Sequence, residues 1–498
     1  MSADRQITLK NAQAQRVWEM FRQINRIPRC SKNEQKIIEW LEDFANSRNL
    51  TCRSDAVGNT VIELLATKGY ENAPTITLQS HVDMVCEKTP ESKHDFSKDP
   101  IEIIERDGWV TANGTTLGAD NGLGVALALA LSDVVGLAHP RLELLFTVDE
   151  ETGLTGVNGL ERGFITGKYL INLDGEDESL IVGCAGGEQT EITLKTEWVD
   201  APAGLDCFAL KVSGLHGGHS GVDIDKKRAN AIKLLAKTLQ VLQDTIDLRI
   251  CSIDAGKAAN AIPRYAQAVI CLDISSVDEV KAMLAELESS FKKEFSATDP
   301  DLKIELKKAT EICLATEHTE DTEKKIINDN SSIINIILAL PTGVYRMSDE
   351  FKGTVETSDN LARVETSRNE NLLRITTMQR SFKVSAMDEL TGKITEITNL
   401  AGAKVTTTGR YPGWEPDSDS HLLKMCTQVY VKLHGKTPPT KVVHAGLEPA
   451  VIKQKFPDIE AISVGPTIQN PHSPQERLNI ASVDDAWNFL LELIPALK

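Results

Sequence analysis

Three short apolar runs in this chain end directly in histidine or acidic residues, and this feature constrains the fold more than any other. The runs and the residues that follow them are 75–80 before His81, 142–148 before Asp149, Glu150 and Glu151, and 169–173 before Asp174. Each run has the length and composition of a buried strand, and a helical stretch at residues 125–131 separates the first two. This alternation predicts an α/β sheet with polar residues gathered at the carboxyl ends of its strands.

The chain has 498 residues, which is too long for a single hydrophobic core and predicts at least two domains. Helical spacing at residues 11–50 and the runs described above indicate a first domain at residues 1–186. Beyond a glycine-rich break, residues 187–400 are predicted to form an inserted α+β domain. The α/β pattern returns at residues 401–498, which we assign to the second part of the first domain.

Inside the predicted insert, strands alternate with long amphipathic helices. Strands are expected near residues 208–212, 266–272 and 372–378, and helices near 227–242, 277–291 and 332–340. Asn260-Ala-Ile-Pro, followed by a strand and a helix, is loosely repeated by Asn360-Leu-Ala-Arg, a strand ending at Arg380 and a helix at 387–400. The repetition suggests a duplicated unit.

Composition and charge exclude several classes of function. With 41% hydrophobic and 25% charged residues and no low-complexity tract, the chain has the composition of a soluble globular protein. Its formal net charge of −18 repels polyanions and no basic stripe is present, so nucleic acid is not an expected partner. No segment approaches the roughly 20 apolar residues of a membrane helix, and residues 1–15 lack a signal-peptide core. We therefore expect a cytoplasmic protein that is not bound to membranes.

The cysteines support the same location. All nine are spaced singly and no CxxC pair occurs, which favours reduced thiols over a disulfide framework or a cysteine-based zinc site. Their positions are 30, 52, 86, 184, 207, 251, 271, 313 and 426.

Two of the polar segments suit a metal site. In His81-Val-Asp83 both polar side chains lie on the same side of an extended segment, so the Asp83 carboxylate can orient a metal-binding His81 ring. In Gly118-Ala-Asp120-Asn-Gly122, the small neighbours leave room for two cations bridged by one carboxylate. Alone, however, the first pair could be structural, and Asp120 could be a plain helix N-cap.

Four further residues complete the set. The adjacent carboxylates at Glu150 and Glu151 repel each other unless a cation neutralises them, and one could bind metal while the other acts as a general base. A solvated acidic turn is the alternative. Asp174 ends the next strand, and the acids at 176–178 are expected to form a solvated loop. His472, flanked by prolines, is a fifth candidate ligand that in isolation would be a surface histidine.

No GxSxG, P-loop, GxGxxG after a strand or HExxH motif competes with this set. Between residues 78 and 478 the chain contains, in this order, SHVDMV, GADNGLG, VDEETGLTG, NLDGE, LHGGHSGVDI, HAGLEPA and GPTIQNPHSP. These segments resemble the M20 family of metallopeptidases, and most closely its aminoacyl-histidine (Xaa-His) dipeptidases, also called peptidase D. The resemblance implies a di-zinc catalytic domain with a mixed sheet flanked by helices, and an inserted α+β lid domain.

The resemblance also implies a role for each site residue. Asp120 would bridge two Zn²⁺ ions, for which Mn²⁺ or Co²⁺ could substitute. The implied remaining ligands are His81 with Asp174 on one metal and Glu151 with His472 on the other. Asp83 would orient His81, and Glu150 would be the general base. In the lid, the implied substrate contacts are His219 on the scissile carbonyl, Asn260 and Arg380 on the substrate's C-terminal carboxylate, and Gly446 in the pocket wall, with Arg363 and Arg368 as alternatives to Arg380.

The implied activity is that of a metal-dependent dipeptidase. It would hydrolyse short peptides, Xaa-His dipeptides such as carnosine among them, by a metal-bridged hydroxide with Glu150 as the base. A deacylase of N-acyl amino acids, and a non-catalytic binding protein on the same scaffold, remain as alternatives. The protein is expected to be a monomer or a homodimer that pairs through the lid.

Overall fold

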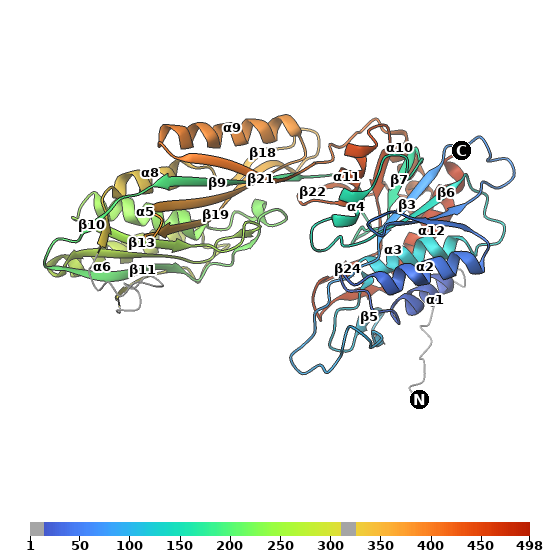
Figure 1. The fold of residues 1–498 in the computed structure, drawn as a ribbon, viewed down its shortest axis with the longest axis horizontal. Helices are drawn as coiled ribbons and strands as arrows, with labels where there is room; N and C mark the ends of the chain where they lie inside the picture. The colour runs from blue at the N-terminus through green and yellow to red at the C-terminus, as the bar shows by residue number, and fades with distance from the viewer. Residues whose placement is uncertain (1–13, 310–324) are drawn as a thin grey trace. The chain divides into compact units, whose positions relative to one another are not determined.

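The computed structural model describes residues 14–309 and 325–498 of the chain, which divides into two compact units (Figure 1). Unit 1 comprises Met1–Cys184, Trp414–Val442 and Leu447–Lys498, and unit 2 comprises Ala185–Gly413 and Val443–Gly446. The start of the first predicted helix, the N-terminal stretch without a signal-peptide core, and Cys313 lie outside the described residues.

Unit 1 is built on an eight-stranded mixed sheet. Its order is β1 (Thr51–Ser54), β2 (Thr60–Leu64), β6 (Leu142–Thr147), β3 (Ile76–His81), β7 (Tyr169–Asn172), β23 (Glu460–Ser463), β8 (Leu180–Cys184) and β22 (Thr440–Val443). The central strands β6, β3, β7 and β23 are parallel, whereas β1, β2 and β8 pair antiparallel with their neighbours. The predicted α/β class with a mixed sheet is confirmed.

Helices cover both faces of this sheet. The helices on one face are α1 (Ala14–Ile24), α2 (Gln35–Ser47), α3 (Ala119–Leu131), α10 (His421–His434) and α12 (Ile480–Ala496). The short helices α4 (Thr155–Gly159) and α11 (Glu448–Lys455) pack on the other face. Neighbouring strand residues point to opposite faces, so Leu144 faces the first group and Leu145 the second. Burial on both faces explains why the central strands are continuous apolar runs.

A small four-stranded sheet carries the loop that contains His472. Its order is β24 (Ile468–Gln469), β25 (Arg477–Asn479), β5 (Trp109–Ala112) and β4 (Ile103–Arg106). The loop joins β24 to β25, whose pairing with each other and with β5 fixes both ends of the loop. The strands β4 and β5 precede α3 in the chain.

Unit 2 contains a nine-stranded antiparallel sheet. Its order is β16 (Lys303–Lys308), β11 (Leu205–Ser213), β15 (Ala266–Asp273), β13 (Arg249–Ala255), β19 (Val355–Ser367), β20 (Leu372–Ser381), β9 (Gly186–Lys195) and β21 (Lys404–Tyr411), with β18 (Gly343–Met347) beside β19. One apolar core is shared with the helices α5 (Ala231–Gln243), α6 (Val277–Glu294), α8 (Asn330–Ala339) and α9 (Val384–Leu400). Two small pairs complete the unit, β10 (Trp198–Asp200) with β17 (Lys325–Ile327) and β12 (Gly218–His219) with β14 (Ala261–Ile262).

The structure corrects three boundaries. Residues 404–411, which we assigned to the second part of the catalytic domain, form β21 and pair with β9 in the sheet of unit 2. Gly446 also belongs to unit 2. Helix α5 begins at Ala231 rather than at 227, because residues 224–226 form a 3₁₀ turn and Lys227 has a φ of +54°. The duplicated unit stays a prediction.

The prediction of reduced thiols is wrong for four cysteines. Cys30 is bonded to Cys86, and Cys207 is bonded to Cys271. Both pairs are separated by more than 50 residues in sequence, so their spacing carries no signal, and the tertiary fold brings the partners together. Among the helices of residues 14–309 and 325–498, none combines the length and apolarity needed to cross a bilayer.

Candidate metal centre

Parallel pairing brings the polar strand ends of unit 1 to one edge of the sheet. His81 is the last residue of β3 and pairs in register with Thr147, the last residue of β6. Glu150 and Glu151 follow β6 by three and four residues, and Asp174 follows β7 by two. The side chains of His81 and Glu151 are 1% and 5% exposed, so this edge is an acidic pocket and not a solvated turn.

Asp120 lies at the centre of this group. Its Oδ1 is 3.1 Å from Nε2 of His81, and its Oδ2 is 3.0 Å from Nε2 of His472. Nε2 of His81 is also 3.5 Å from Oδ1 of Asp174, and Nε2 of His472 is 3.0 Å from Oε2 of Glu151. The two oxygens of one carboxylate therefore face two separate His and carboxylate pairs.

The backbone at the start of α3 positions Asp120. Gly118 is the N-cap residue of this helix, and the two carboxylate oxygens of Asp120 face His81 and His472, so Asp120 is not simply an N-cap. The φ and ψ of Asp120, −79° and 112°, are not helical. A Cβ added at Gly118 would lie 2.5 Å from Nη2 of Arg29, so glycine is required for close packing there.

Asp83 links His81 to the turn that carries the two glutamates. Its Oδ1 is 3.3 Å from Nδ1 of His81, on the ring edge opposite the candidate ligand atom. The same carboxylate accepts the backbone N–H groups of Glu150 at 3.0 Å and Glu151 at 3.3 Å, and the hydroxyl of Ser31 at 2.8 Å. Asp83 therefore contacts both the His81 ring and the turn after β6, and the second contact was not expected from the sequence.

The donor set fits divalent cations. Four buried or half-buried carboxylates crowd two imidazoles, and Oε1 of Glu151 is buried without a hydrogen-bond partner. Burial raises the pKa of Asp174 to about 7, and hydrogen bonds to Asp120 and Glu151 raise the pKa of His472 to about 11. Protons bound by Asp174 and His472 reduce the repulsion among the carboxylates. Bound divalent cations would reduce the same repulsion.

Glu150 differs from Glu151 in its surroundings. Burial, together with the charges of Asp174, Glu448 and Glu151, raises the pKa of Glu150 well above its ordinary value, although nearby His81 opposes this. A carboxylate with a raised pKa can take a proton and return it near neutral pH. Glu151, in contrast, contacts His472 directly. The two adjacent glutamates therefore have different chemical environments.

Glu476, which the sequence reading missed, holds the segment that carries Asp120. It is 2% exposed, and its carboxylate accepts four consecutive backbone N–H groups. The donors are Leu117 at 2.7 Å, Gly118 at 3.0 Å, Ala119 at 2.8 Å and Asp120 at 3.3 Å. Glu476 lies four residues after His472, so one loop provides a candidate ligand and also fixes the position of Asp120. The signal available in sequence was an acidic residue just beyond His472.

Two more buried charged residues were missed. Arg29 is 1% exposed and donates to the carbonyl oxygens of Val82, Asp83 and Gly118, which ties the segments after β3 and before α3 together. Glu448 is 1% exposed and accepts hydrogen bonds from Gln79 and Thr147 behind the strand ends. Burial raises the pKa of Glu448 to about 7. Arg29 thus contacts backbone oxygens beside β3 and α3, and Glu448 contacts side chains of β3 and β6.

The predicted substrate contacts lie in unit 2. Arg380 is 4% exposed, and its guanidinium donates to the hydroxyls of Tyr411 at 2.6 Å and Ser220 at 3.4 Å. Ser220 follows His219 in sequence, and its N–H donates to the carbonyl oxygen of Asn260 at 2.7 Å. Burial and the Arg380 charge lower the pKa of His219. Unit 2 thus brings His219, Asn260 and Arg380 together.

Gly446 and the alternative arginines can be compared with this group. A Cβ added at Gly446 would lie 2.9 Å from the Tyr411 ring, so Gly446 packs against a neighbour of Arg380. Arg363 is exposed and pairs with Glu365. Arg368 is half-buried and is the first residue of the turn between β19 and β20. Of the three arginines, Arg380 alone is buried beside His219.

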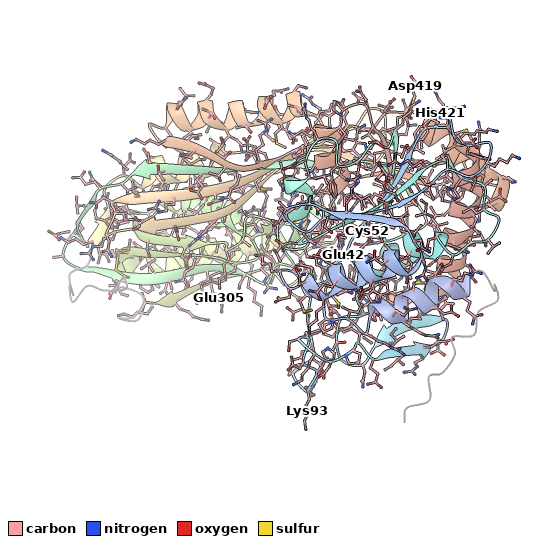
Figure 2. All side chains as sticks on the ribbon, turned by 45° about the vertical axis from the view of Figure 1, so that its right-hand side comes forward. Glu42, Cys52, Lys93, Glu305, Asp419 and His421 are labelled. Carbon is pink, nitrogen blue, oxygen red and sulfur yellow. A yellow bond between two sulfur atoms is a disulfide. The ribbon has the colours of Figure 1, made fainter. Side chains whose placement is uncertain are left out.

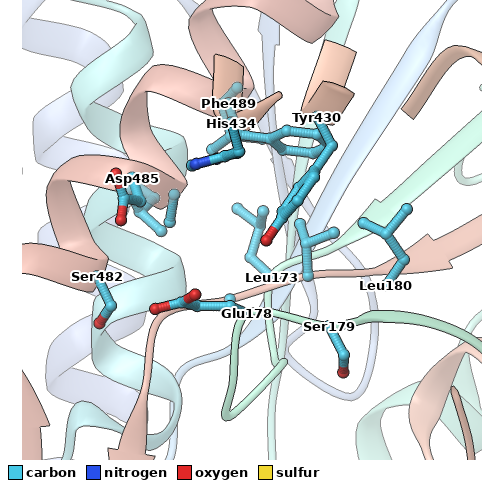
Figure 3. Close-up of a pocket in the computed structure, with 14 residues that line it drawn as sticks. Leu173, Glu178, Ser179, Leu180, Tyr430, His434, Ser482, Asp485 and Phe489 are labelled. Atoms are coloured by element: carbon cyan, nitrogen blue, oxygen red, sulfur yellow. The ribbon is translucent and has the colours of Figure 1, made fainter. Parts of the chain in front are cut away.

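A separate hollow of unit 1 has a largely apolar lining (Figure 3). Its walls include Leu173, Leu180, Tyr430 and Phe489, and Glu178 lies at its polar margin. No candidate site residue lines it, although Leu173 immediately precedes Asp174. The hollow is therefore distinct from the acidic pocket.

The fold and the acidic pocket define a hydrolase of the metallopeptidase class, and comparison with known proteins identifies the family. Residues 77–496 match peptidase family M20/M25/M40. The chain is 37% identical over 487 residues to the cytosol non-specific dipeptidase of Escherichia coli (strain K12), and the match covers 98% of each chain. The crystal structure of aminoacylhistidine dipeptidase from Vibrio alginolyticus matches with a TM-score of 0.87 and 36% identity, covering 99% of this chain and 98% of that one.

A more distant structure shares the fold alone. The aminopeptidase PepT from Bacillus cereus matches with a TM-score of 0.56 at 17% identity, covering 97% of this chain and 98% of that one. With a family match over most of its length and a relative above 30% identity, the chain belongs to peptidase family M20/M25/M40. The predicted M20 membership is confirmed.

Proposed function

We propose that this chain is a metal-dependent dipeptidase that hydrolyses short peptides, Xaa-His dipeptides such as carnosine among them. The observation that carries the proposal is the central carboxylate of Asp120, whose two oxygens each face a separate pair of His and acidic side chains. The names of two full-length relatives, a cytosol non-specific dipeptidase and an aminoacylhistidine dipeptidase, support the substrate class. The name of the first also supports a cytoplasmic location.

The proposed cofactor is a pair of Zn²⁺ ions, with Mn²⁺ or Co²⁺ as substitutes. Asp120 would contact both ions, His81 and Asp174 would complete one site, and Glu151 and His472 the other. Imidazole and carboxylate ligands suit Zn²⁺, and small separations between two such sites suit a shared carboxylate. The chemistry that two bound cations supply is polarisation of the peptide carbonyl and a lowered pKa of water.

The protein residues would then move the proton and hold the substrate. Glu150 would take a proton from the attacking water and return it to the leaving amine, a role that its raised pKa supports. Asp83 would keep Glu150 in place through the backbone N–H that it accepts. In unit 2, His219 would polarise the scissile carbonyl, while Asn260 and the buried Arg380 would bind the terminal carboxylate of the substrate.

A substrate panel tests the proposed activity. The metal-loaded protein would be assayed with carnosine, other Xaa-His dipeptides, unrelated dipeptides, a tripeptide and an N-acetyl amino acid. We expect turnover of dipeptides. Preference for the N-acetyl compound would identify a deacylase. If no compound were turned over, the remaining hypothesis would be a non-catalytic binding protein.

Glu150→Gln tests the mechanism. The amide cannot accept the proton, so turnover should fall about 10²–10⁴-fold. Metal analysis should still find about two ions per chain, because Glu150 is not a proposed ligand. The matched control is Glu161→Gln in the same unit, which changes an exposed side chain and should leave turnover unaltered. A Glu150→Gln protein with the activity of the wild type would exclude Glu150 as the base.

A further inference from the structure

Three cysteines lie side by side on three neighbouring strands of unit 2. In the order β11, β15, β13, Cys207 is directly opposite its disulfide partner Cys271. On the other side, the register between β13 and β15 shifts at Ile250 and Ser252, and the extra residue is Cys251. Sγ of Cys251 is 3.1 Å from Sγ of Cys271. The central cysteine, Cys271, therefore has a sulfur neighbour on each side.

The cluster is enclosed unevenly. Cys207 and Cys271 are 4% and 0% exposed and lie in a small apolar cluster with Val269 and Ile326. Neighbouring residues of the same strands, Phe208 and Leu272, belong instead to the large core shared with the helices. The cysteines thus lie on the opposite face of the sheet. Cys251 is the half-buried member of the three.

The unequal exposure controls which sulfur a reagent can reach. A disulfide opens when a thiolate attacks one of its sulfur atoms, and the reaction requires access to that atom. A small thiol in solution cannot approach the buried Cys207–Cys271 bond directly. Cys251 is both more accessible and already in contact with Cys271. It is therefore placed between the solvent and the buried bond.

We propose that Cys207, Cys251 and Cys271 form a thiol–disulfide relay, in which Cys251 exchanges with low-molecular-mass thiols and disulfides and passes the bond to the buried pair. In the internal step, the Cys251 thiolate forms a bond to Sγ of Cys271 while the Cys271–Cys207 bond breaks. Cys207 leaves as a thiolate and takes up the proton that Cys251 lost. One disulfide and one thiol are present before and after, so this step needs no oxidant.

The outward step connects the relay to solution. A low-molecular-mass thiol RSH attacks Cys251 in the Cys251–Cys271 bond, which gives a Cys251–S–S–R mixed disulfide and a Cys271 thiol. A second RSH releases RSSR and leaves three protein thiols, so two electrons pass from two RSH molecules to the protein. Oxidation by RSSR follows the same steps in reverse. The Cys251–Cys271 bond is therefore an obligatory intermediate in both directions.

The rate of opening of the buried disulfide tests the relay. The full-length oxidised protein would be incubated with reduced glutathione as the probe, quenched with acid, and analysed by disulfide peptide mapping. We expect a mixed disulfide on Cys251 before all three thiols appear. Cys251→Ser should slow the loss of the Cys207–Cys271 bond at least about tenfold, because the intramolecular attack is removed. The control is Cys52→Ser in unit 1 (Figure 2). In this variant the Cys207–Cys271 bond should open at the wild-type rate.

A second variant tests the alternative bond itself. Cys207→Ser should contain a Cys251–Cys271 disulfide after oxidation by glutathione disulfide. The proposal would be overturned if Cys251 and Cys271 of the oxidised Cys207→Ser protein were both alkylatable thiols. An unchanged rate of opening of the Cys207–Cys271 bond in Cys251→Ser would also overturn it. Cys251→Ser keeps the wild-type disulfide and replaces a half-buried residue, so its rate decides the question even if Cys207→Ser does not fold. Neither measurement depends on peptidase activity.

Discussion

Replacing Glu476 with glutamine removes a charge from the loop that positions Asp120 while keeping the side chain's shape. Oε2 of Glu476 accepts the N–H groups of Leu117 and Gly118, and Oε1 accepts those of Ala119 and Asp120. The amide of glutamine has one oxygen and one NH₂ group. In either orientation, two of the four backbone N–H groups would face a donor and lose their acceptor.

The size of the effect follows from these contacts. A hydrogen bond to a charged group contributes about 1.5–3 kcal/mol, so two lost bonds remove about 3–6 kcal/mol. Part of this loss is offset, because burial raises the pKa of Glu476 and a neutral amide avoids the cost of burying the charge. We expect the free energy of unfolding to fall by about 2–4 kcal/mol. Metal affinity should fall at least about tenfold, because this requires the binding free energy to weaken by only about 1.4 kcal/mol when the segment of Asp120 is held less firmly.

Urea unfolding followed by circular dichroism, with and without added Zn²⁺, measures the first quantity, and competition with a chromogenic chelator measures the second. The control is Glu492→Gln in α12, because Glu492 is 41% exposed and pairs with Lys432 at the surface. Such a pair contributes about 0–1 kcal/mol. If Glu476→Gln unfolds within about 0.5 kcal/mol of the wild type and binds metal equally well, the four N–H contacts do not hold the segment as reasoned.

Three other changes have defined outcomes. Burial raises the pKa of Asp359 from 3.8 to about 7, so the folded state keeps a proton that the unfolded state releases, and stability falls as the pH rises through this window. The wild type should lose about 3 kcal/mol of its free energy of unfolding between about pH 5 and pH 8, and Asp359→Asn should not. Parallel pH profiles of the two proteins in urea unfolding would contradict this. Dialysis against a chelator should abolish turnover and lower the urea midpoint, and added Zn²⁺ should restore both; full activity without metal would refute the cofactor. Arg380→Met should raise KM for dipeptides about 30-fold or more with a smaller change in kcat, whereas exposed Arg363→Met should not, and equal KM values would remove Arg380 from the substrate site.

The candidate site was largely predictable because its residues follow strands that are apolar throughout. His81, Glu150, Glu151 and Asp174 interrupt such runs, and a polar residue at the end of a buried strand is visible in sequence. Neighbouring parallel strands then bring these ends to one edge of the sheet. His472 was recognisable mainly through the family resemblance, since it lies in a loop between two very short strands.

Strand β19 shows where pattern reading fails. Its residues 356–360 are polar and buried, so no apolar run announces it. Asp359 accepts a hydrogen bond from Gln379, which in turn accepts one from Thr190, so side-chain hydrogen bonds connect three strands. Such a strand is stable only inside the finished sheet. The exposed threonines of β21 were missed for a related reason, because their partner β9 supplies the pairing.

The sequence alone determined the α/β class, the inserted position of unit 2 and the residue types of the acidic pocket, because periodicity and strand-end polarity are local properties of the chain. The tertiary structure alone determined the contacts that make these residues a site. Asp120 and Glu476 are 356 residues apart, and Cys30 and Cys86 are 56 apart. Hydrogen bonds and disulfides between such distant segments depend on distances of a few ångströms, which packing sets and residue spacing does not encode.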